Sequence, residues 1–135
     1  PRLRLRGVDA ETVAENLVAV INQRLVRRVC PHCRTGRPAT DEERAWLGVE
    51  DTPTLFHGAG CPSCRGSGYR GRLPVYEVLT VHRELADAIM AEAPRAKLRE
   101  LAEAGGLKPM SRLARHRVLA GETTLEEIRR AIGWD

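Results

Sequence analysis

Two short stretches, Cys30-Pro31-His32-Cys33 and Cys61-Pro62-Ser63-Cys64, begin in the same way and contain every cysteine of the chain. In each stretch one tight turn presents two sulfurs to a single point. The proline after the first cysteine fixes φ and has no N–H group that needs a partner. Together the four cysteines form a C-x2-C-x27-C-x2-C pattern, which is typical of a structural zinc site with four thiolate ligands.

The four cysteines are the predicted metal ligands: Cys30, Cys33, Cys61 and Cys64. Four thiolates leave no coordination position for water, so we expect a structural zinc ion rather than a catalytic one. His32 and His57 lie beside the two pairs and are secondary candidates as ligands. Three alternatives stay open for the same thiols: disulfides, a thioredoxin-like redox pair, and an iron or iron–sulfur site.

The sequence before the first pair predicts a helix and then a short extended segment. Asp9 has the properties of a helix cap, and apolar residues at helical spacing predict a helix that ends between residues 23 and 27. Residues 25–29 are expected to be extended. Several arginines flank the thiols, and each is expected either to surround the thiolates or to be solvated: Arg27, Arg28, Arg34, Arg65, Arg70 and Arg72.

Between the pairs the sequence predicts a loop with Gly36 and Pro38, a helix and a brief strand. Thr40 and Glu43 have the spacing of a capping box, so a short helix is expected to follow Thr40 and to end at Leu47. Gly66 follows the second pair at a position that needs a positive φ. The predicted strands are residues 54–57 and 72–80.

After residue 80 the pattern becomes wholly helical. Thr124 and Glu127 have the spacing of a second capping box. We expect an α+β fold, mostly helical, with a small four-cysteine zinc module, and we expect the helices after Thr80 to survive loss of the metal because they have amphipathic faces of their own. The predicted helices are residues 82–92, 94–104, 110–120 and 125–132.

The chain has 135 residues and a net charge of +4, carried almost wholly by arginine. A positive net charge is typical of proteins that bind nucleic acid or an anionic membrane surface. Charges of alternating sign along the predicted helices instead favour helix faces exposed to solvent. No apolar stretch approaches the ~20 residues that span a bilayer, and no apolar run follows the charged start as it does in a signal peptide. Because the chain begins with Pro1, we expect further sequence before it.

Motifs that carry catalysis are absent from the sequence. The phosphate-binding pattern G-x-x-x-x-G-K-[ST] does not occur, since neither Lys97 nor Lys108 follows a glycine. The adjacent carboxylates at 42–43 and 126–127 lie in the first turns of predicted helices, where the helix dipole explains them. We therefore expect that this chain alone is not catalytic.

Four segments, in this order, resemble the ATPases of type II secretion and type IV pilus assembly, the GspE/PilB class. Residues 22–33 are similar to the start of the tetracysteine domain of that family, and residues 60–72 with 75–79 are similar to its second half. Residues 119–128 look like the start of its C-terminal helix. Leu73-Pro74 replaces the usual Thr-Gly, so the choice between the secretion and the pilus subfamily stays open.

The resemblance implies a cytoplasmic hexameric motor, peripheral to the bacterial inner membrane, that docks on an inner-membrane platform or on cytoplasmic docking proteins. It implies that residues 1–29 are the tail of a RecA-like ATPase domain, residues 30–72 the zinc module, and residues 73–135 a short strand with a C-terminal helical subdomain. ATP and Mg²⁺ would be bound by the parent protein through residues upstream of this chain. The chain itself would have a structural and docking role.

Two other zinc-binding classes share parts of the pattern. A zinc-ribbon module for nucleic acid is the main alternative, supported by the basic charge, although no basic stripe lies beside a run of aromatic residues. Residues 61–68 also match one unit of the zinc region of DnaJ-type chaperones, which needs four such units. An affinity for DNA or RNA that falls steeply with salt would distinguish the nucleic-acid class from the motor class.

Overall fold

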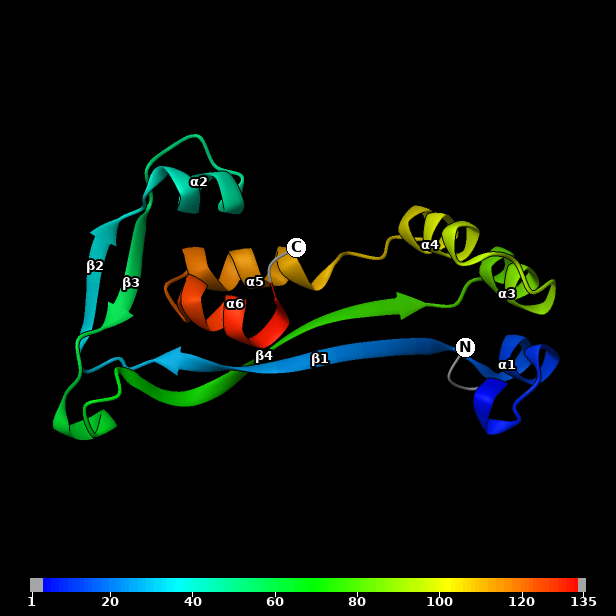
Figure 1. Cartoon of the computed structure of the whole chain (residues 1–135), viewed down its shortest axis with the longest axis horizontal. Coiled ribbons are helices and arrows are strands. Elements are labelled where there is room, and N and C mark those ends of the chain that lie inside the picture. The colour runs from blue at the N-terminus through cyan, green and yellow to red at the C-terminus, as the bar shows by residue number, and fades with distance from the viewer. Residues whose placement is uncertain (1–3, 134–135) are drawn as a thin grey trace. The chain divides into compact units, whose positions relative to one another are not determined.

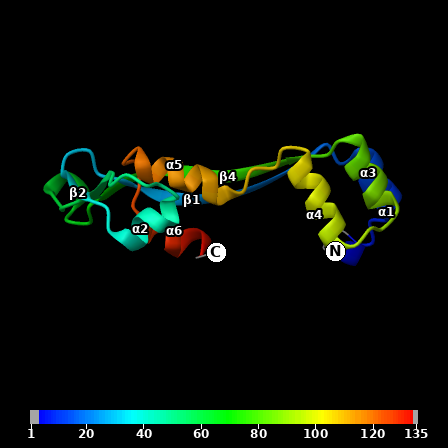
Figure 2. The ribbon, with the colours of Figure 1, turned by 90° about the horizontal axis from the view of Figure 1, so that it is seen from above.

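Residues 4–133 are described by the structure, a computed structural model of the chain that is drawn in two views (Figure 1 and Figure 2). The first three residues of the charged start and the last two residues of the chain lie outside this range. The chain divides into two compact units: unit one contains residues 1–22 and 77–109, and unit two contains residues 23–76 and 110–135. Within the described range no helix is both long and apolar enough to cross a bilayer.

Two long strands are hydrogen-bonded to each other as a two-stranded sheet (Figure 1): β1 (Ala19–Val29) and β4 (Tyr69–Thr80). Before β1, the carbonyl of Val18 accepts a hydrogen bond from the N–H of Val81 at 2.8 Å, and after β1 the N–H of Cys30 donates to the carbonyl of Gly68 at 2.9 Å. The two contacts run in opposite order along the two segments, so the strands are antiparallel.

The first helix is shorter than its apolar spacing predicts. Helix α1 spans Ala10–Asn16, and Asp9 caps it as expected, because its Oδ1 accepts a hydrogen bond from the N–H of Thr12 at 2.7 Å. The predicted continuation of this helix to residues 23–27 is wrong, since β1 begins at Ala19. The β-branched residues of β1 favour a strand, and the partner strand that completes its hydrogen bonds lies far along the chain.

Unit one contains α1 and two further helices, α3 (Arg83–Met90) and α4 (Arg95–Ala104), which confirm the helices predicted there. A short 3₁₀ turn, Arg4–Arg6, precedes α1. Helix α3 contacts both α1 and α4.

Unit two contains a second sheet that the sequence reveals only in part. β2 (Arg34–Pro38) pairs with β3 (Thr54–Gly58) in antiparallel register, with Arg34 opposite Gly58. The strand predicted at residues 54–57 is confirmed, but the loop predicted for residues 34–38 is wrong. β2 is an edge strand, where a proline is tolerated, and its pairing with β3 overrides a composition that disfavours strands.

Three helices complete unit two: α2 (Asp41–Leu47), α5 (Met110–Leu119) and α6 (Leu125–Ile132). All three were predicted, and the capping box of Thr40 and Glu43 is present at the start of α2. These helices share one core with the strands, made of Val26, Ala39, Leu47, Leu55, Leu73, Val75, Met110, Ala114, Val118 and Ile128. The expected α+β fold, mostly helical, is confirmed, whereas the domain boundaries at residues 29 and 72 concern a whole motor and stay a prediction.

The N-terminal end of α2 generates a prediction about stability. Glu43 accepts hydrogen bonds from both terminal nitrogens of Arg37, at 2.7 and 2.6 Å, and from the N–H of Thr40 at 2.8 Å. Because charge-assisted bonds to a largely buried carboxylate are lost, Glu43→Gln is expected to lower the free energy of unfolding by about 1.5–3 kcal/mol at neutral pH. Urea denaturation of the variant and the wild type, with metal present, measures this change in the free energy of unfolding.

The matched control for this prediction is Glu42→Gln, one residue earlier on the same helix. The Glu42 side chain is 73% exposed and pairs with Arg129 at 2.7 Å, and an exposed ion pair contributes less than about 1 kcal/mol. Equal losses in the two variants would contradict the stabilising role of Glu43.

Candidate metal centre

The two cysteine turns bring four thiols to one point in unit two. Cys30 follows the last residue of β1 and Cys33 precedes β2. Cys61 caps a 3₁₀ turn, η2 (Pro62–Cys64), that contains the fourth cysteine. The four sulfur atoms all lie within 4.8 Å of one another, with Cys30 and Cys64 buried and the other two half-buried.

The spacing of these sulfurs matches a tetrahedral site. The Sγ atoms are 3.9 Å apart for Cys30 and Cys61, 3.8 Å for Cys33 and Cys64, and 3.7 Å for Cys61 and Cys64. Four sulfurs placed about 2.3 Å from one central ion lie about 3.8 Å from each other. These three pairs already have the spacing of a tetrahedral site, and the four-cysteine group could hold a metal ion.

The same geometry argues against two of the three alternatives for these thiols, the disulfides and the thioredoxin-like pair. A disulfide needs a sulfur–sulfur distance of about 2.05 Å, and all four cysteines are free thiols here. A thioredoxin-like pair needs a cysteine at the start of an α-helix that follows a strand, whereas these pairs lie in a turn between β1 and β2 and in η2. An iron site uses the same ligands, so the geometry by itself leaves the metal's identity open.

Backbone N–H groups stabilise a thiolate in the second turn. The N–H of Cys61 donates to the Sγ of Cys64 at 3.2 Å and that of Gly68 donates to the same atom at 3.3 Å. Burial raises the pKa of the Cys64 thiol, but these two hydrogen bonds, together with those from the Cys61 and Cys33 thiols, outweigh it and lower the pKa to about 6. Burial and the neighbouring cysteine thiols raise the pKa of the Cys33 thiol to about 12, so four thiolates would coexist here only around a cation.

The remaining residues that the sequence placed near the thiols have other environments. His32 and His57 are exposed and do not belong to the metal-ligand group that the described residues form. Arg27 pairs with Glu127 at 2.7 Å, and the Arg34 guanidinium lies over the Phe56 ring, 3.7 Å from its centroid. The other four arginines that flank the thiols are exposed: Arg28, Arg65, Arg70 and Arg72. Gly66 has a φ of 76°, as predicted.

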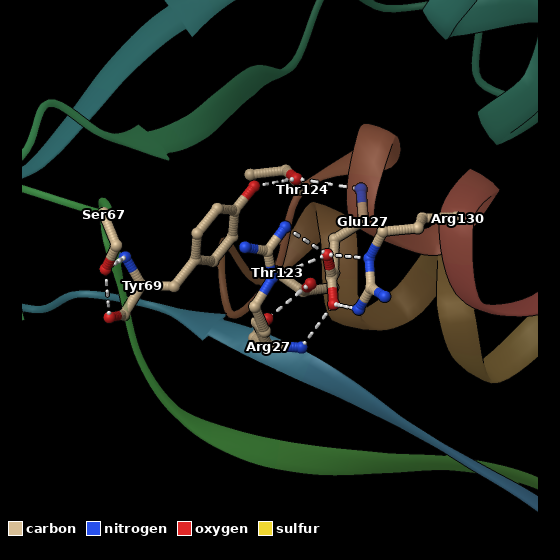
Figure 3. A network of polar contacts seen from close by, with 7 residues as sticks. All are labelled: Arg27, Ser67, Tyr69, Thr123, Thr124, Glu127 and Arg130. Atoms are coloured by element: carbon tan, nitrogen blue, oxygen red, sulfur yellow. Dashed lines mark hydrogen bonds and ion pairs between the residues drawn. The ribbon is translucent and has the colours of Figure 1, made fainter.

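The partners of a buried carboxylate in unit two were missed by the sequence analysis. Glu127 is fully buried, and its two oxygens accept hydrogen bonds from the backbone N–H and the guanidinium of Arg27 and from the guanidinium of Arg130 (Figure 3). The N–H of Glu127 donates to Thr124 Oγ1 at 3.2 Å, so half of the predicted capping box is present. The carboxylate itself bonds to Arg27, a partner 100 positions away that no local pattern reveals.

A cavity of about 360 Å³ lies in the same unit. Leu55, Phe56, Val118 and Leu125 provide its apolar lining. Polar side chains line the rest of it: Arg37, Glu43, His57, Tyr69, Thr124 and Glu126. The Arg37 and Glu43 side chains pair with each other, and Tyr69 Oη and Thr124 Oγ1 lie 2.8 Å apart. Four of the six polar side chains that line the cavity therefore have partners among themselves.

Comparisons with known proteins agree along nearly the whole chain. Residues 1–130 match a family model described as "Type II/IV secretion system protein". The chain is 36% identical over 131 residues to the type IV pilus assembly ATPase PilB of Thermus thermophilus, a match that covers 94% of this chain and 15% of that protein. It is 34% identical to the type II secretion system protein E of Aeromonas hydrophila, with 96% of this chain and 26% of that protein covered.

The buried Glu127 carboxylate gives a pH-dependent contribution to stability. Burial raises its pKa, but hydrogen bonds from Arg130 and Arg27 outweigh this and lower the pKa from 4.5 to about 2. Because the pKa of Glu127 is lower in the folded chain than in the unfolded chain, its ionised carboxylate stabilises the fold at pH values above about 4.5. This contribution is lost as the pH falls from about 4.5 toward 2 and the carboxylate is protonated. The full contribution at neutral pH is on the order of 3 kcal/mol.

Glu127→Gln is therefore expected to be less stable than the wild type by an amount that is largest above pH 6 and shrinks below about pH 4.5. Urea denaturation of both proteins at a series of pH values measures this difference, and any loss of metal in acid affects both. Glu126→Gln, an exposed neighbour on the same helix, serves as the control. A stability difference that stays constant from neutral to acid pH would contradict the role assigned to Glu127.

Proposed function

Because the chain belongs to the type II/IV secretion system protein family, we propose that it is the C-terminal zinc-binding region of a motor ATPase that powers type II secretion or type IV pilus assembly. The observation that carries this proposal is the cluster of four thiols, all within 4.8 Å of one another, in a chain that matches the family over residues 1–130. The chain spans 15% and 26% of the length of the two relatives above. The motor's ATP, its Mg²⁺ and its hydrolysis belong, in this proposal, to parts of the protein upstream of these residues.

The proposed metal is zinc, bound by Cys30, Cys33, Cys61 and Cys64. Zinc accepts four thiolates in tetrahedral geometry and undergoes no redox change, which suits a closed site with no position for water. Two neighbouring N–H groups already favour a thiolate at Cys64. In this proposal the four sulfurs bind an ion that joins the two cysteine turns, and the site takes no part in catalysis.

The segment between the cysteine pairs supports a structural role for the metal. Residues 34–60 contribute only Ala39, Leu47 and Leu55 to the buried core. Ordering a backbone costs about 1–2 kcal/mol per residue, which so little burial does not offset. Zinc binding to small modules contributes on the order of 10–16 kcal/mol near neutral pH, enough to make up much of the difference.

The proposed place of this region in the parent protein follows from the family. Residues 1–29 would be the tail of a RecA-like ATPase domain, residues 30–72 the zinc module, and residues 73–135 a strand with C-terminal helices. The parent would be a hexamer, cytoplasmic and peripheral to the bacterial inner membrane. The relatives are named as ATPases of pilus assembly and proteins of type II secretion, which supports docking on an inner-membrane platform or on cytoplasmic proteins of such a machine.

Metal analysis tests the identity of the bound ion. Protein purified without added metal is expected to contain one zinc ion per chain and no inorganic sulfide, because the four thiols form one closed site. Plasma emission spectrometry and a sulfide assay on the same sample measure both. Iron with sulfide, or protein that folds with no metal at all, would contradict the proposed zinc site.

A variant of the parent motor tests the structural and docking role. Cys61→Ser removes one ligand and is expected to abolish secretion or pilus assembly, while nucleotide binding by the motor stays within about twofold because the metal supplies no chemistry. Ser63→Ala, in the same turn and exposed, is the matched control and is expected to keep full function. Normal export by the Cys61→Ser motor, with metal absent, would contradict the proposal.

A further inference from the structure

The turn between α5 and α6 is bonded to the chain on both sides of the first cysteine pair. The backbone N–H of Val29, which directly precedes Cys30, donates to the carbonyl of Glu122 at 2.9 Å. The guanidinium of Arg34, which directly follows Cys33, donates to the carbonyl of Ala120 at 3.2 Å. Movement of the first cysteine turn would therefore break contacts of residues 120–122.

The same turn is bonded to the chain that leaves the second cysteine pair. Tyr69 Oη lies 2.8 Å from Thr124 Oγ1 (Figure 3). Tyr69 follows Gly68, whose N–H donates to the Sγ of Cys64 and whose carbonyl accepts from the N–H of Cys30. Residues 120–124 thus contact the segments that flank both cysteine pairs.

Arg27 makes further contacts with this region, to Thr123 and to Glu127, which lies one helical turn after Thr123. Thr123 Oγ1 donates to the carbonyl of Arg27 at 2.9 Å, and the Arg27 guanidinium lies over the Tyr69 ring, 4.2 Å from its centroid, while it pairs with the Glu127 carboxylate (Figure 3). Arg27 stands three positions before Cys30. The start of α6 is thereby fixed to the last residues of β1 and the first residue of β4.

The turn packs so closely on this region that only glycine fits at its centre. Gly121 has a φ of 67°, and a Cβ atom there would lie 2.2 Å from a terminal nitrogen of Arg34 and 2.4 Å from a ring carbon of Phe56. These distances are far below van der Waals contact. A larger residue at position 121 would push against the residue that directly follows Cys33.

We propose that the α5–α6 hairpin, residues 110–132, is a metal-dependent arm: ion binding at the four cysteines fixes the segments that hold residues 120–127, and loss of the ion releases both helices. The inference rests on the proposed metal site and goes beyond it, because neither helix supplies a ligand. It also revises the expectation that all helices after Thr80 survive loss of metal. Helices α3 and α4 belong to unit one, whereas α5 and α6 share unit two with the centre.

Hydrogen exchange on the 135-residue chain, with zinc bound and after removal of zinc by a chelator, tests the release. Amides of α5 and α6 are expected to lose protection by on the order of 100-fold without metal, together with residues 34–58, while those of α4 change less than about twofold. Unchanged protection in α5 and α6, with residues 34–58 unprotected, would overturn the proposed arm and leave the metal site intact. A wild-type chain that binds no zinc would overturn both.

Zinc affinity gives the reciprocal test, because coupling between two sites acts equally in both directions. Gly121→Ala is expected to weaken zinc binding by about 10–100-fold, measured by competition with a chromogenic chelator. The control is Gly106→Ala, which has a positive φ of 95° but no atom near the added Cβ and lies in unit one. It is expected to bind zinc as the wild type does.

Tyr69→Phe provides a milder variant should Gly121→Ala not fold. It removes only the hydroxyl that meets Thr124 and keeps the ring beneath Arg27. Zinc binding several-fold weaker than in the wild type is expected, with faster exchange in α6. Wild-type zinc affinity in both Gly121→Ala and Tyr69→Phe would overturn the coupling.

Discussion

The close approach of four sulfur atoms is the constraint on which the rest of unit two depends. It joins residues 30–33 to residues 61–64 and closes a loop of 27 residues that holds β2, α2 and β3. Such a loop has too little apolar surface to order itself, so its fold needs an additional source of free energy. A metal ion bound at the four sulfurs, as proposed, would supply it, because such an ion binds the folded chain far more tightly than the unfolded one.

A second constraint, the buried carboxylate of Glu127, acts at the opposite end of the sequence. Its charge is removed from water and is stabilised by Arg27 and Arg130 and by one backbone N–H. A buried carboxylate with such partners stabilises the fold only while all of them are in place. The arrangement makes the C-terminal helices part of the same structure as the cysteine turns, although Glu127 lies 100 positions after its partner Arg27.

Membership of the type II/IV secretion system family gives these constraints a context. In the proposed motor the chain has a structural and docking role. Unit one, with α1, α3 and α4, folds around contacts that involve neither the metal centre nor the hairpin.

The sequence by itself indicated the group of four cysteines, the family and most helices, because cysteine spacing, capping residues and amphipathic periods act over a few positions. Tertiary structure decided the rest. Residues 19–24 became part of β1 rather than a helix, and residues 34–38 became β2, because each found a hydrogen-bonding partner strand elsewhere in the chain. Glu127 looked like half of a capping box and instead faces Arg27. Contacts between residues distant in sequence leave no local pattern, and only the folded chain shows them.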